Sequence, residues 1–414
     1  MKFDYGCIGE VLKHSFSKEI HNKLADYNYE LIEVARDDFN RFCTDREFKA
    51  INVTIPYKEL IIPHLSWIDP IAKKIGAVNT VVNKGGKLYG YNTDFYGMSL
   101  LIEHAKIDLK NKKVVILGTG GTSKTAYEVA SSMGAREILK VSREKKENVI
   151  TYGELYESHT DTEVIINTTP VGTYPNIFNS PLDLAPFTSL LGVIDAVYNP
   201  LRTPLITEAK KKGVSAEGGL YMLVAQAVRA SEIFTDRKYD TGTVESIFKS
   251  IYSKKENVVL TGMPASGKST VGKIIAKELN REFIDTDILI EKAEGKTIPE
   301  IFSQYGENYF RDVEERLIKS IAADAGKVIA TGGGAILREA NVDALKENGK
   351  IFFIDRPLES LMPTSDRPLA SDRDAIKKRY TERYEIYRNT ADVAVDANAD
   401  AVTVSQRIMK EFSI

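Results

Sequence analysis

The sequence has few of the residues that disulfides and metal centres require. Among its 414 residues are only two cysteines, Cys7 and Cys43, which do not form a C-x-x-C pair. The five histidines are scattered and show no metal-ligand spacing. The sequence therefore gives no support for a disulfide framework or a cysteine- or histidine-based metal site, and we expect both thiols to be reduced and buried.

The sequence also lacks an excess of either charge and long apolar runs. Its 56 basic and 58 acidic residues give a formal charge of −2, which offers no electrostatic case for nucleic acid or an anionic membrane as partner. No stretch approaches 18 apolar residues, and Asp4 and Gly6 lie where a signal peptide needs an apolar run. We therefore expect a cytoplasmic protein that holds any anionic substrate by local clusters.

The composition is that of an ordinary globular protein, and the chain is too long to fold around a single hydrophobic core. It is 43% apolar and 28% charged, and 414 residues predict two or three domains. Short strands and helices alternate from the N-terminus, which is the pattern of an open α/β sheet.

The most specific motif lies past the middle, in the stretch NVVLTGMPASGKST at residues 257–270. A short β-branched run comes before it and a helix-forming run follows, so G-x-x-x-x-G-K-S stands in a strand-loop-helix context. The residues predicted to contact a nucleoside triphosphate there are Gly262, Gly267, Lys268, Ser269 and Thr270. The competing interpretation, a glycine-rich turn that binds nothing, is disfavoured by that context.

The chemistry of phosphate binding explains these residue types. The glycines let backbone N–H groups face phosphate oxygens at a helix N-terminus, and Lys268 neutralises the β/γ charge. The Ser269 hydroxyl can ligate Mg²⁺.

A second phosphate-type loop lies at residues 118–123, with the sequence GTGGTS, between the strands expected at Val114–Leu117 and Glu137–Val141. It has the first two glycines of a dinucleotide loop, Gly118 and Gly120, while Ser123 replaces the third. Ser142-Arg143 follows the second strand, where an NAD-preferring domain has an acidic residue, and Arg suits a 2′-phosphate. The loop therefore predicts NADP(H) in preference to NAD(H), although Glu144 could repel that phosphate.

Polar residues also gather at a predicted strand end near the N-terminus. Asn52, Thr54 and Lys58 follow an apolar strand that Pro56 interrupts, and strand ends are where α/β sheets build sites. For a lone Lys, or for Asp94 in its loop, a solvated surface charge is the usual alternative.

Seven motifs follow one another over about residues 1–250. They are Ser15-x-Ser17, Asn52-Val53-Thr54-x-Pro56-x-Lys58, Gly76-Ala77-Val78-Asn79-Thr80, Asn92-Thr93-Asp94, the Gly-x-Gly-Gly loop, Asp195-x-x-Tyr198-x-Pro200 and Gly219-Leu220-x-Met222-Leu223-x-x-Gln226. In order and spacing these motifs resemble shikimate dehydrogenase.

This resemblance implies a role for each matching residue. Lys58 and Asp94 would be the acid/base pair, a combination that can protonate the alkoxide formed by hydride transfer. The residues expected to bind the substrate carboxylate are Ser15, Ser17 and Tyr198, and those expected to bind the ring oxygens are Thr54, Asn79 and Gln226. The residues expected at NADPH are Gly118, Gly120, Gly121, Thr122, Ser123, Ser142 and Arg143.

The C-terminal part, about residues 255–414, has its own series of motifs. They are the phosphate loop, Phe283-x-Asp285-x-Asp287, Gly306-Glu307-x-x-Phe310-Arg311-x-x-Glu314, Gly332-Gly333-Gly334, Arg367-Pro368-Leu369 and Arg383 before Tyr387. At these spacings the motifs resemble shikimate kinase. By resemblance, Asp285 would assist Mg²⁺ with Ser269, and Asp287 would orient the acceptor hydroxyl.

Arginines supply the remaining charge in that resemblance. Arg311 and Arg383 would grip a carboxylate beside Gly333 and Gly334, and Arg367 would bring a cation to the transferring phosphoryl group from a lid. A surface ion pair is the alternative for each arginine.

We therefore predict an α/β chain of three domains. Residues 1–100 form the substrate-binding domain, which helices near 220–250 complete. Residues 101–253 form a Rossmann-like NADP domain with a mostly parallel sheet, and residues 254–414 form a P-loop kinase domain with a parallel sheet. The function of the chain would be reduction of 3-dehydroshikimate with NADPH, then phosphorylation of shikimate with MgATP, as a monomer or homodimer. The alternatives are a quinate/shikimate dehydrogenase with relaxed cofactor use, or one part that is catalytically silent and serves as a sensing or scaffold module. A P-loop GTPase is disfavoured because no Asn-Lys-x-Asp element is present.

Overall fold

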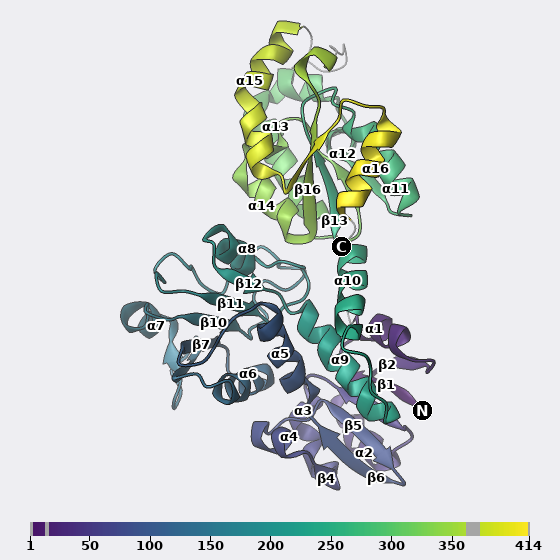
Figure 1. Ribbon diagram of the computed structural model, residues 1–414, viewed down its shortest axis with the longest axis vertical. Coiled ribbons are helices and arrows are strands. Elements are labelled where there is room, and N and C mark those ends of the chain that lie inside the picture. Colours follow the sequence, from purple (N-terminus) through teal and green to yellow (C-terminus); the bar gives the residue numbers. More distant parts are fainter. Residues whose placement is uncertain (1–2, 13–15, 362–372, 413–414) are drawn as a thin grey trace. The chain divides into compact units, whose positions relative to one another are not determined.

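Three α/β sheets organise the chain in a computed structural model that describes residues 3–12, 16–361 and 373–412 (Figure 1). The chain divides into two compact units, one of Met1–Asn199 with Glu208–Ser250 and the other of Pro200–Thr207 with Ile251–Ile414. The predicted α/β class with mostly parallel sheets is confirmed. The three-domain boundaries at residues 100 and 253 stay a prediction.

The first sheet has the strand order β2-β1-β3-β5-β6-β4, and β5 and β6 form an antiparallel hairpin. Its strands are β1 Tyr5–Gly9, β2 Tyr29–Glu33, β3 Ala50–Val53, β4 Trp67–Ile68, β5 Thr80–Lys84 and β6 Lys87–Tyr91. The helices of this region are α1 Ser17–Leu24, α2 Phe39–Asp45, α3 Tyr57–Leu60, α4 Pro70–Ile75 and α5 Thr93–His104, with 3-10 turns at Arg36–Asp38 and Ile62–His64. Both free cysteines, Cys7 and Cys43, are buried, as predicted.

The second sheet is wholly parallel, in the order β12-β11-β10-β7-β8-β9. Its strands are β7 Lys113–Leu117, β8 Glu137–Ser142, β9 Ile150–Thr151, β10 Val164–Asn167, β11 Gly192–Asp195 and β12 Ser215–Glu217. The helices are α6 Gly121–Ser132, α7 Tyr152–Ser158, α8 Pro204–Lys211, α9 Leu220–Thr235 and α10 Thr243–Lys255. Strand order reverses between β7 and β10, which is where doubly wound sheets bind ligands.

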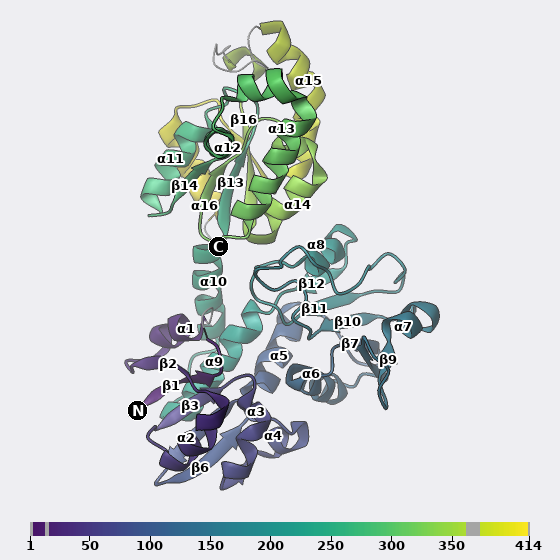
Figure 2. The same ribbon diagram turned by 180° about the vertical axis from the view of Figure 1, so that it is seen from behind.

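Helix α5 lies along α9 in both views of the first unit (Figures 1 and 2). The helices approach closely because residue 97 is glycine. A Cβ there would lie 2.7 Å from the Met222 carbonyl oxygen, which is a clash with backbone. This contact brings Asp94, at the start of α5, near Gln226 on α9.

The third sheet, in the other unit, is parallel with the order β14-β15-β13-β16-β17. Its strands are β13 Asn257–Thr261, β14 Phe283–Asp285, β15 Val328–Ala330, β16 Gly349–Asp355 and β17 Val393–Asp396. The helices are α11 Lys268–Glu278, α12 Thr286–Glu294, α13 Ile298–Ala322, α14 Glu339–Asn348, α15 Arg373–Thr390 and α16 Ala401–Phe412, with 3-10 turns at Ala335–Leu337 and Leu358–Ser360.

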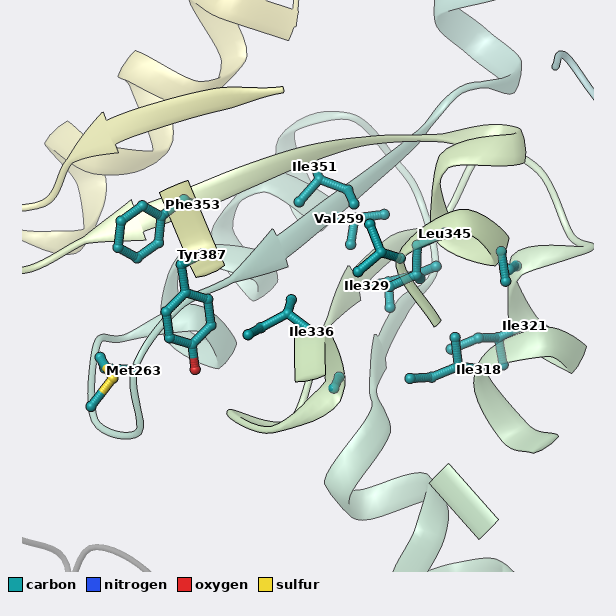
Figure 3. Packing of buried hydrophobic residues seen from close by; sticks show 14 of the residues in the cluster. Val259, Met263, Ile318, Ile321, Ile329, Ile336, Leu345, Ile351, Phe353 and Tyr387 are labelled. Carbon is teal, nitrogen blue, oxygen red and sulfur yellow. The ribbon is translucent and has the colours of Figure 1, made fainter. Parts of the chain in front are cut away.

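Helices cover both faces of the third sheet, with α11 and α16 on one and α13, α14 and α15 on the other (Figure 1). The centre of strand β13 is therefore apolar on both faces: Val258 and Leu260 pack toward one layer and Val259 toward the other. Figure 3 shows the second layer, where the rings of Phe353 and Tyr387 stack with centroids 5.2 Å apart. Within the described residues, no helix is long and apolar enough to cross a membrane.

Candidate active sites

A lysine and an aspartate form the centre of the first site. Lys58 lies on α3, the single turn of helix after β3, and Asp94 lies in the first turn of α5, which the Asn92 side chain caps. Lys58 Nζ donates to Asp94 Oδ2 at 2.6 Å. The two side chains are only 19% and 10% exposed, so water screens their charges little.

Two amide side chains border this pair. Asn79 Nδ2 donates to Asp94 Oδ1 at 2.9 Å, and Asn79 Oδ1 accepts from the Thr93 backbone N–H at 2.7 Å. Gln226, on α9, accepts from the Thr93 hydroxyl at 3.4 Å. Both ends of the Asn79 amide are thus already bonded within the protein.

The pair opens into a cavity of about 380 Å³. Of the predicted dehydrogenase residues, the cavity is lined by Ser17, Thr54, Lys58, Asn79, Asp94, Thr122, Tyr198 and Gln226. Cys7 and Asn52 also line it, although no motif in the sequence pointed to the thiol. Burial raises the pKa of Cys7 to about 12, so its sulfur remains a thiol. Ser15 lies outside the described residues.

A second cavity of about 250 Å³ adjoins the dinucleotide loop and shares Thr122 and Tyr198 with the first. Thr168 and Thr169, directly after β10, line it together with Tyr174. These three residues were not assigned from the sequence, although a strand that ends in small polar residues beside the switch point was a usable signal.

The backbone conformation of the dinucleotide loop, and the space around it, account for its residue types. Gly118 has φ of +110°, and a Cβ there would lie 2.8 Å from Thr168 Oγ1. Gly120 and Gly121 open α6 with nothing within 4 Å of a Cβ, which leaves space at the helix N-terminus. Ser123, in place of the third glycine, is buried and donates to the Gly118 carbonyl at 2.7 Å.

The residues predicted for the 2′-phosphate follow β8. Ser142 is its last residue, and its hydroxyl donates to the Glu144 carbonyl. Arg143 is exposed, so its guanidinium is accessible to a ligand.

The phosphate loop of the third sheet joins β13 to α11. Lys268 curls over the loop, and its Nζ donates to the carbonyls of Gly262 and Met263 at 2.8 and 2.9 Å. Gly262 and Gly267 have φ of +148° and +93°, which favour glycine. Thr270, two residues after Lys268, is exposed.

Ser269 and Asp285 form an oxygen pair beside this loop. Ser269 Oγ donates to Asp285 Oδ2 at 2.6 Å, and Asp285 Oδ1 accepts from the Asp287 backbone N–H at 3.1 Å. No group of three or more His, Cys, Asp or Glu that could hold a metal occurs among the described residues. One hydroxyl and one carboxylate still fit Mg²⁺, because this ion keeps several waters and takes further oxygens from nucleotide phosphates.

A cavity of about 320 Å³ lies next to the oxygen pair. Of the predicted kinase residues, it is lined by Ser269, Asp285, Asp287, Arg311, Gly333, Gly334 and Arg383, with Gly332 beside them. A Cβ at residue 332 would lie 2.5 Å from Asp287 Oδ1, so glycine makes room for that carboxylate. Arg383 Nη1 donates to the Gly333 carbonyl at 3.0 Å.

The Arg311 guanidinium forms ion pairs with two glutamates, Glu307 and Glu314. Its Nη1 lies 2.6 Å from Glu314 Oε2 and its Nη2 lies 3.1 Å from Glu307 Oε1. Glu314 is fully buried and, within the described part of the chain, its Oε1 has no hydrogen-bond partner. Burial raises the pKa of Glu314, and the adjacent guanidinium opposes that rise.

Sequence reasoning missed one cation beside the phosphate loop. Arg356 directly follows β16, and its Nη1 lies 3.6 Å from the position of a Cβ on Gly267. The Arg356 Nε is buried and has no hydrogen-bond partner among the residues that the structure describes. The signal available in the sequence was an arginine at a strand end of a parallel sheet. Arg367 lies outside the described residues.

These folds and cavities are typical of two joined enzyme classes, an oxidoreductase with a dinucleotide-type loop and a kinase with a phosphate-type loop. Comparison with known families then gives the particular families. Residues 7–81 match the model of the shikimate dehydrogenase substrate binding domain, and residues 264–413 match that of shikimate kinase.

Relatives that match the N-terminal part are named shikimate dehydrogenases. A shikimate dehydrogenase (NADP(+)) of Clostridium perfringens strain SM101 / Type A is 39% identical over 265 residues, covering 60% of this chain and 97% of the relative. Shikimate dehydrogenase 1 from Peptoclostridium difficile is 36% identical with a TM-score of 0.56, over 61% of this chain and 98% of that one. A Thermus thermophilus shikimate 5-dehydrogenase, solved with NADP(H) and shikimate, is 27% identical with a TM-score of 0.55, over 60% and 99%.

The chain therefore belongs to the shikimate dehydrogenase family, and it carries a shikimate kinase domain after the dehydrogenase part.

Proposed function

We propose that the dehydrogenase part reduces 3-dehydroshikimate to shikimate with NADPH, and that the kinase part phosphorylates shikimate with MgATP to give shikimate 3-phosphate. The observation that carries the first reaction is the Lys58–Asp94 pair, with its 2.6 Å contact, in a cavity that shares Thr122 and Tyr198 with the pocket at the dinucleotide loop. A proton donor and a dinucleotide pocket side by side are what carbonyl reduction requires.

Bound NADPH supplies the hydride that the carbonyl carbon accepts. Lys58 Nζ then donates a proton to the oxygen that carries the developing negative charge, so that ketone becomes secondary alcohol. Asp94 keeps the ammonium oriented through their hydrogen bond. Because both side chains are mostly buried, this interaction is stronger than it would be in water.

The polar groups around the cavity suit a hydroxylated ring with one carboxylate. Ser17 and Tyr198 would donate to the carboxylate, and Thr54, Asn79 and Gln226 would address the ring oxygens. Burial raises the pKa of Tyr198, which keeps its hydroxyl protonated as a donor. The predicted part of Ser15 in this contact remains a proposal.

The kinase cavity suits the same acid as phosphoryl acceptor. Arg311 and Arg383 offer planar donors to a carboxylate, and Asp287 would accept the proton of the attacking hydroxyl. On the nucleotide side, Lys268 would leave its loop carbonyls for the β/γ-phosphates, and Ser269 with Asp285 would hold Mg²⁺, which neutralises phosphate charge. Arg367 is proposed to add a cation from the lid.

A substrate and cofactor matrix tests this proposal. The purified chain is given shikimate or quinate with NADP⁺ or NAD⁺, and NAD(P)H formation is followed; separately, shikimate or quinate is given with MgATP, and ADP is followed. The proposal predicts that shikimate with NADP⁺ gives the highest kcat/KM in the first set and that only shikimate releases ADP in the second. Equal or faster oxidation of quinate with NAD⁺ would contradict the dehydrogenase assignment.

The setting of the enzyme is also a proposal. Both cysteines are free and buried, which supports work in a reducing compartment such as the cytoplasm. Whether the chain is a monomer or a homodimer is a question for light scattering.

A further inference from the structure

A continuous set of buried hydrogen bonds links Tyr29, on β2, to Asp94 at the centre of the dehydrogenase site. Tyr29 Oη donates to Asn52 Oδ1 at 2.6 Å, and Asn52 Nδ2 donates to Thr80 Oγ1 at 3.1 Å. Thr80 Oγ1 donates to Asn79 Oδ1 at 3.1 Å, and Asn79 Nδ2 donates to Asp94 Oδ1 at 2.9 Å. The strands that supply the first two side chains, β2 and β3, lie on either side of β1 in one sheet (Figure 2).

The asparagine amides in this set have a defined direction, while the Thr80 hydroxyl can donate to Asn79 Oδ1 at 3.1 Å or to Thr93 Oγ1 at 3.2 Å. The Thr93 backbone N–H donates to Asn79 Oδ1 at 2.7 Å, so the Asn79 amide cannot flip without facing two N–H groups toward each other. The Asn79 NH₂ group is therefore directed at Asp94. On the other side, Asn52 Nδ2 also donates to the Asn79 carbonyl at 3.3 Å, which ties the two asparagines together.

Tyr29 is held as rigidly as the asparagines. Its side chain is fully buried, and its ring stacks on His21 with centroids 3.9 Å apart and an interplanar angle of 6°. Burial raises the pKa of Tyr29 and lowers that of His21 to about 3. Tyr29 thus remains a neutral hydrogen-bond donor at any pH where the enzyme works.

A purely structural explanation covers part of this arrangement, because buried polar groups need partners. The need for partners does not explain why the hydrogen bonds lead to Asp94, the carboxylate that contacts Lys58. Asp94 Oδ1 accepts from Asn79, while Asp94 Oδ2 accepts from Lys58 at 2.6 Å. The orientation of the carboxylate toward Lys58 therefore depends on the Asn79 amide, which the Thr93 backbone N–H orients. Asn52, held by Tyr29, contacts Asn79 through its backbone carbonyl and through the Thr80 hydroxyl.

We propose that Tyr29 is a positioning residue for carbonyl reduction, which acts through Asn52 and Asn79 to orient Asp94 against Lys58. This inference rests on the proposed dehydrogenase function. Removing the Tyr29 hydroxyl leaves Asn52 Oδ1 without its donor, so the Asn52 amide turns and its bonds to Thr80 and Asn79 loosen. The carboxylate then samples orientations in which Lys58 delivers its proton poorly.

The test compares Tyr29→Phe with Tyr27→Phe. Tyr27 is a matched control, because it is a second tyrosine in contact with His21, with its hydroxyl 2.6 Å from Nδ1, but this hydroxyl donates to Ser231 and not toward Asp94. We expect Tyr29→Phe to lower kcat for 3-dehydroshikimate reduction by about tenfold, the effect of one misplaced hydrogen bond. The KM for NADPH should stay unchanged, and the solvent deuterium isotope effect on kcat should rise as proton delivery becomes rate-limiting. Tyr27→Phe should leave kcat within about twofold of wild type.

Thr80→Val provides a second break in the set, in case Tyr29→Phe fails to fold. It is expected to reproduce the lower kcat and the larger isotope effect. If kcat and the isotope effect stay at wild-type values in a folded variant, or change equally in Tyr27→Phe, Tyr29 has no positioning role. A wild-type enzyme without dehydrogenase activity would instead overturn the proposed function itself.

Discussion

Replacing Gly334 with alanine is expected to weaken the kinase reaction through the position of Arg311 alone. Gly334 has φ of −110° and ψ of −2°, which alanine adopts without strain. The added Cβ would lie 2.3 Å from both Arg311 Nη1 and Nη2, whereas ordinary contact begins at 3.4 Å. The guanidinium must therefore move by about 1 Å.

The size of the effect follows from what holds Arg311. The guanidinium is fixed by Glu314 at 2.6 Å and by Glu307 at 3.1 Å, so moving it disturbs both ion pairs as well as its contact with a substrate carboxylate. A hydrogen bond to a charged group contributes about 1.5–3 kcal/mol. The KM for shikimate is thus expected to rise about 10- to 100-fold.

The assay follows ADP release at varied shikimate and saturating MgATP. The dehydrogenase activity of the same chain is the internal control and should not change. The same substitution is also made in an Arg311→Lys variant, because lysine keeps the charge but has no guanidinium with which the new Cβ would clash. Gly334→Ala is expected to add less than about twofold there. An equal loss in both backgrounds would show that alanine acts elsewhere, and the reasoning would be wrong.

Three further predictions address the two reactions and the pH dependence. Lys58→Ala should remove only NADPH oxidation and Lys268→Ala only ADP release, by at least about 100-fold each; loss of both activities in either variant would refute independent sites. Arg356→Ala should raise the KM for ATP about fivefold while the KM for shikimate stays constant; an unchanged KM for ATP would remove Arg356 from the nucleotide site. The pKa of His21 is about 3 in the folded chain, against an ordinary value of 6.5. Between pH 6.5 and pH 3 the unfolded chain therefore binds one proton that the folded chain does not. As the pH falls through this range, His21 lowers the free energy of unfolding by about 1.4 kcal/mol per pH unit. Urea titrations followed by fluorescence of Trp67, the single tryptophan, should show this slope in wild type and a shallower one in His21→Gln; equal slopes would mean that His21 is not held neutral.

The sequence predicted the elements whose signal is local. The β-branched run before the phosphate loop predicts a strand, and β13 is found there at Asn257–Thr261, because such a run marks a buried parallel strand on its own. The helix after it begins at Lys268, inside the motif and earlier than its apolar run, since the loop glycines already place Lys268 at the helix N-terminus.

Features that depend on distant residues could not be read from the sequence. Lys58 was expected at a strand end but lies on one turn of helix after Pro56, too short to show a helical period. The partners of Tyr29 and Asn52 lie on other strands, so no spacing along the chain reveals their hydrogen bonds. Likewise, the approach of Arg356 to the phosphate loop arises only because β16 pairs with β13.

Residue roles came from the resemblance to two families and not from geometry. The structure brings most of those residues into two cavities, but their individual contacts with substrate stay predictions until variants are measured.

The most direct measurement follows NADPH loss and ADP release together in the intact chain, with 3-dehydroshikimate, NADPH and MgATP. The proposed function predicts that ADP appears only once NADPH is being consumed, and that leaving out NADPH abolishes ADP release. Release of ADP without NADPH would mean that the kinase part accepts a different substrate, and loss of NADPH with no ADP would mean that the product of the first site does not serve the second. Either result would contradict the central claim that two consecutive reactions take place on this chain.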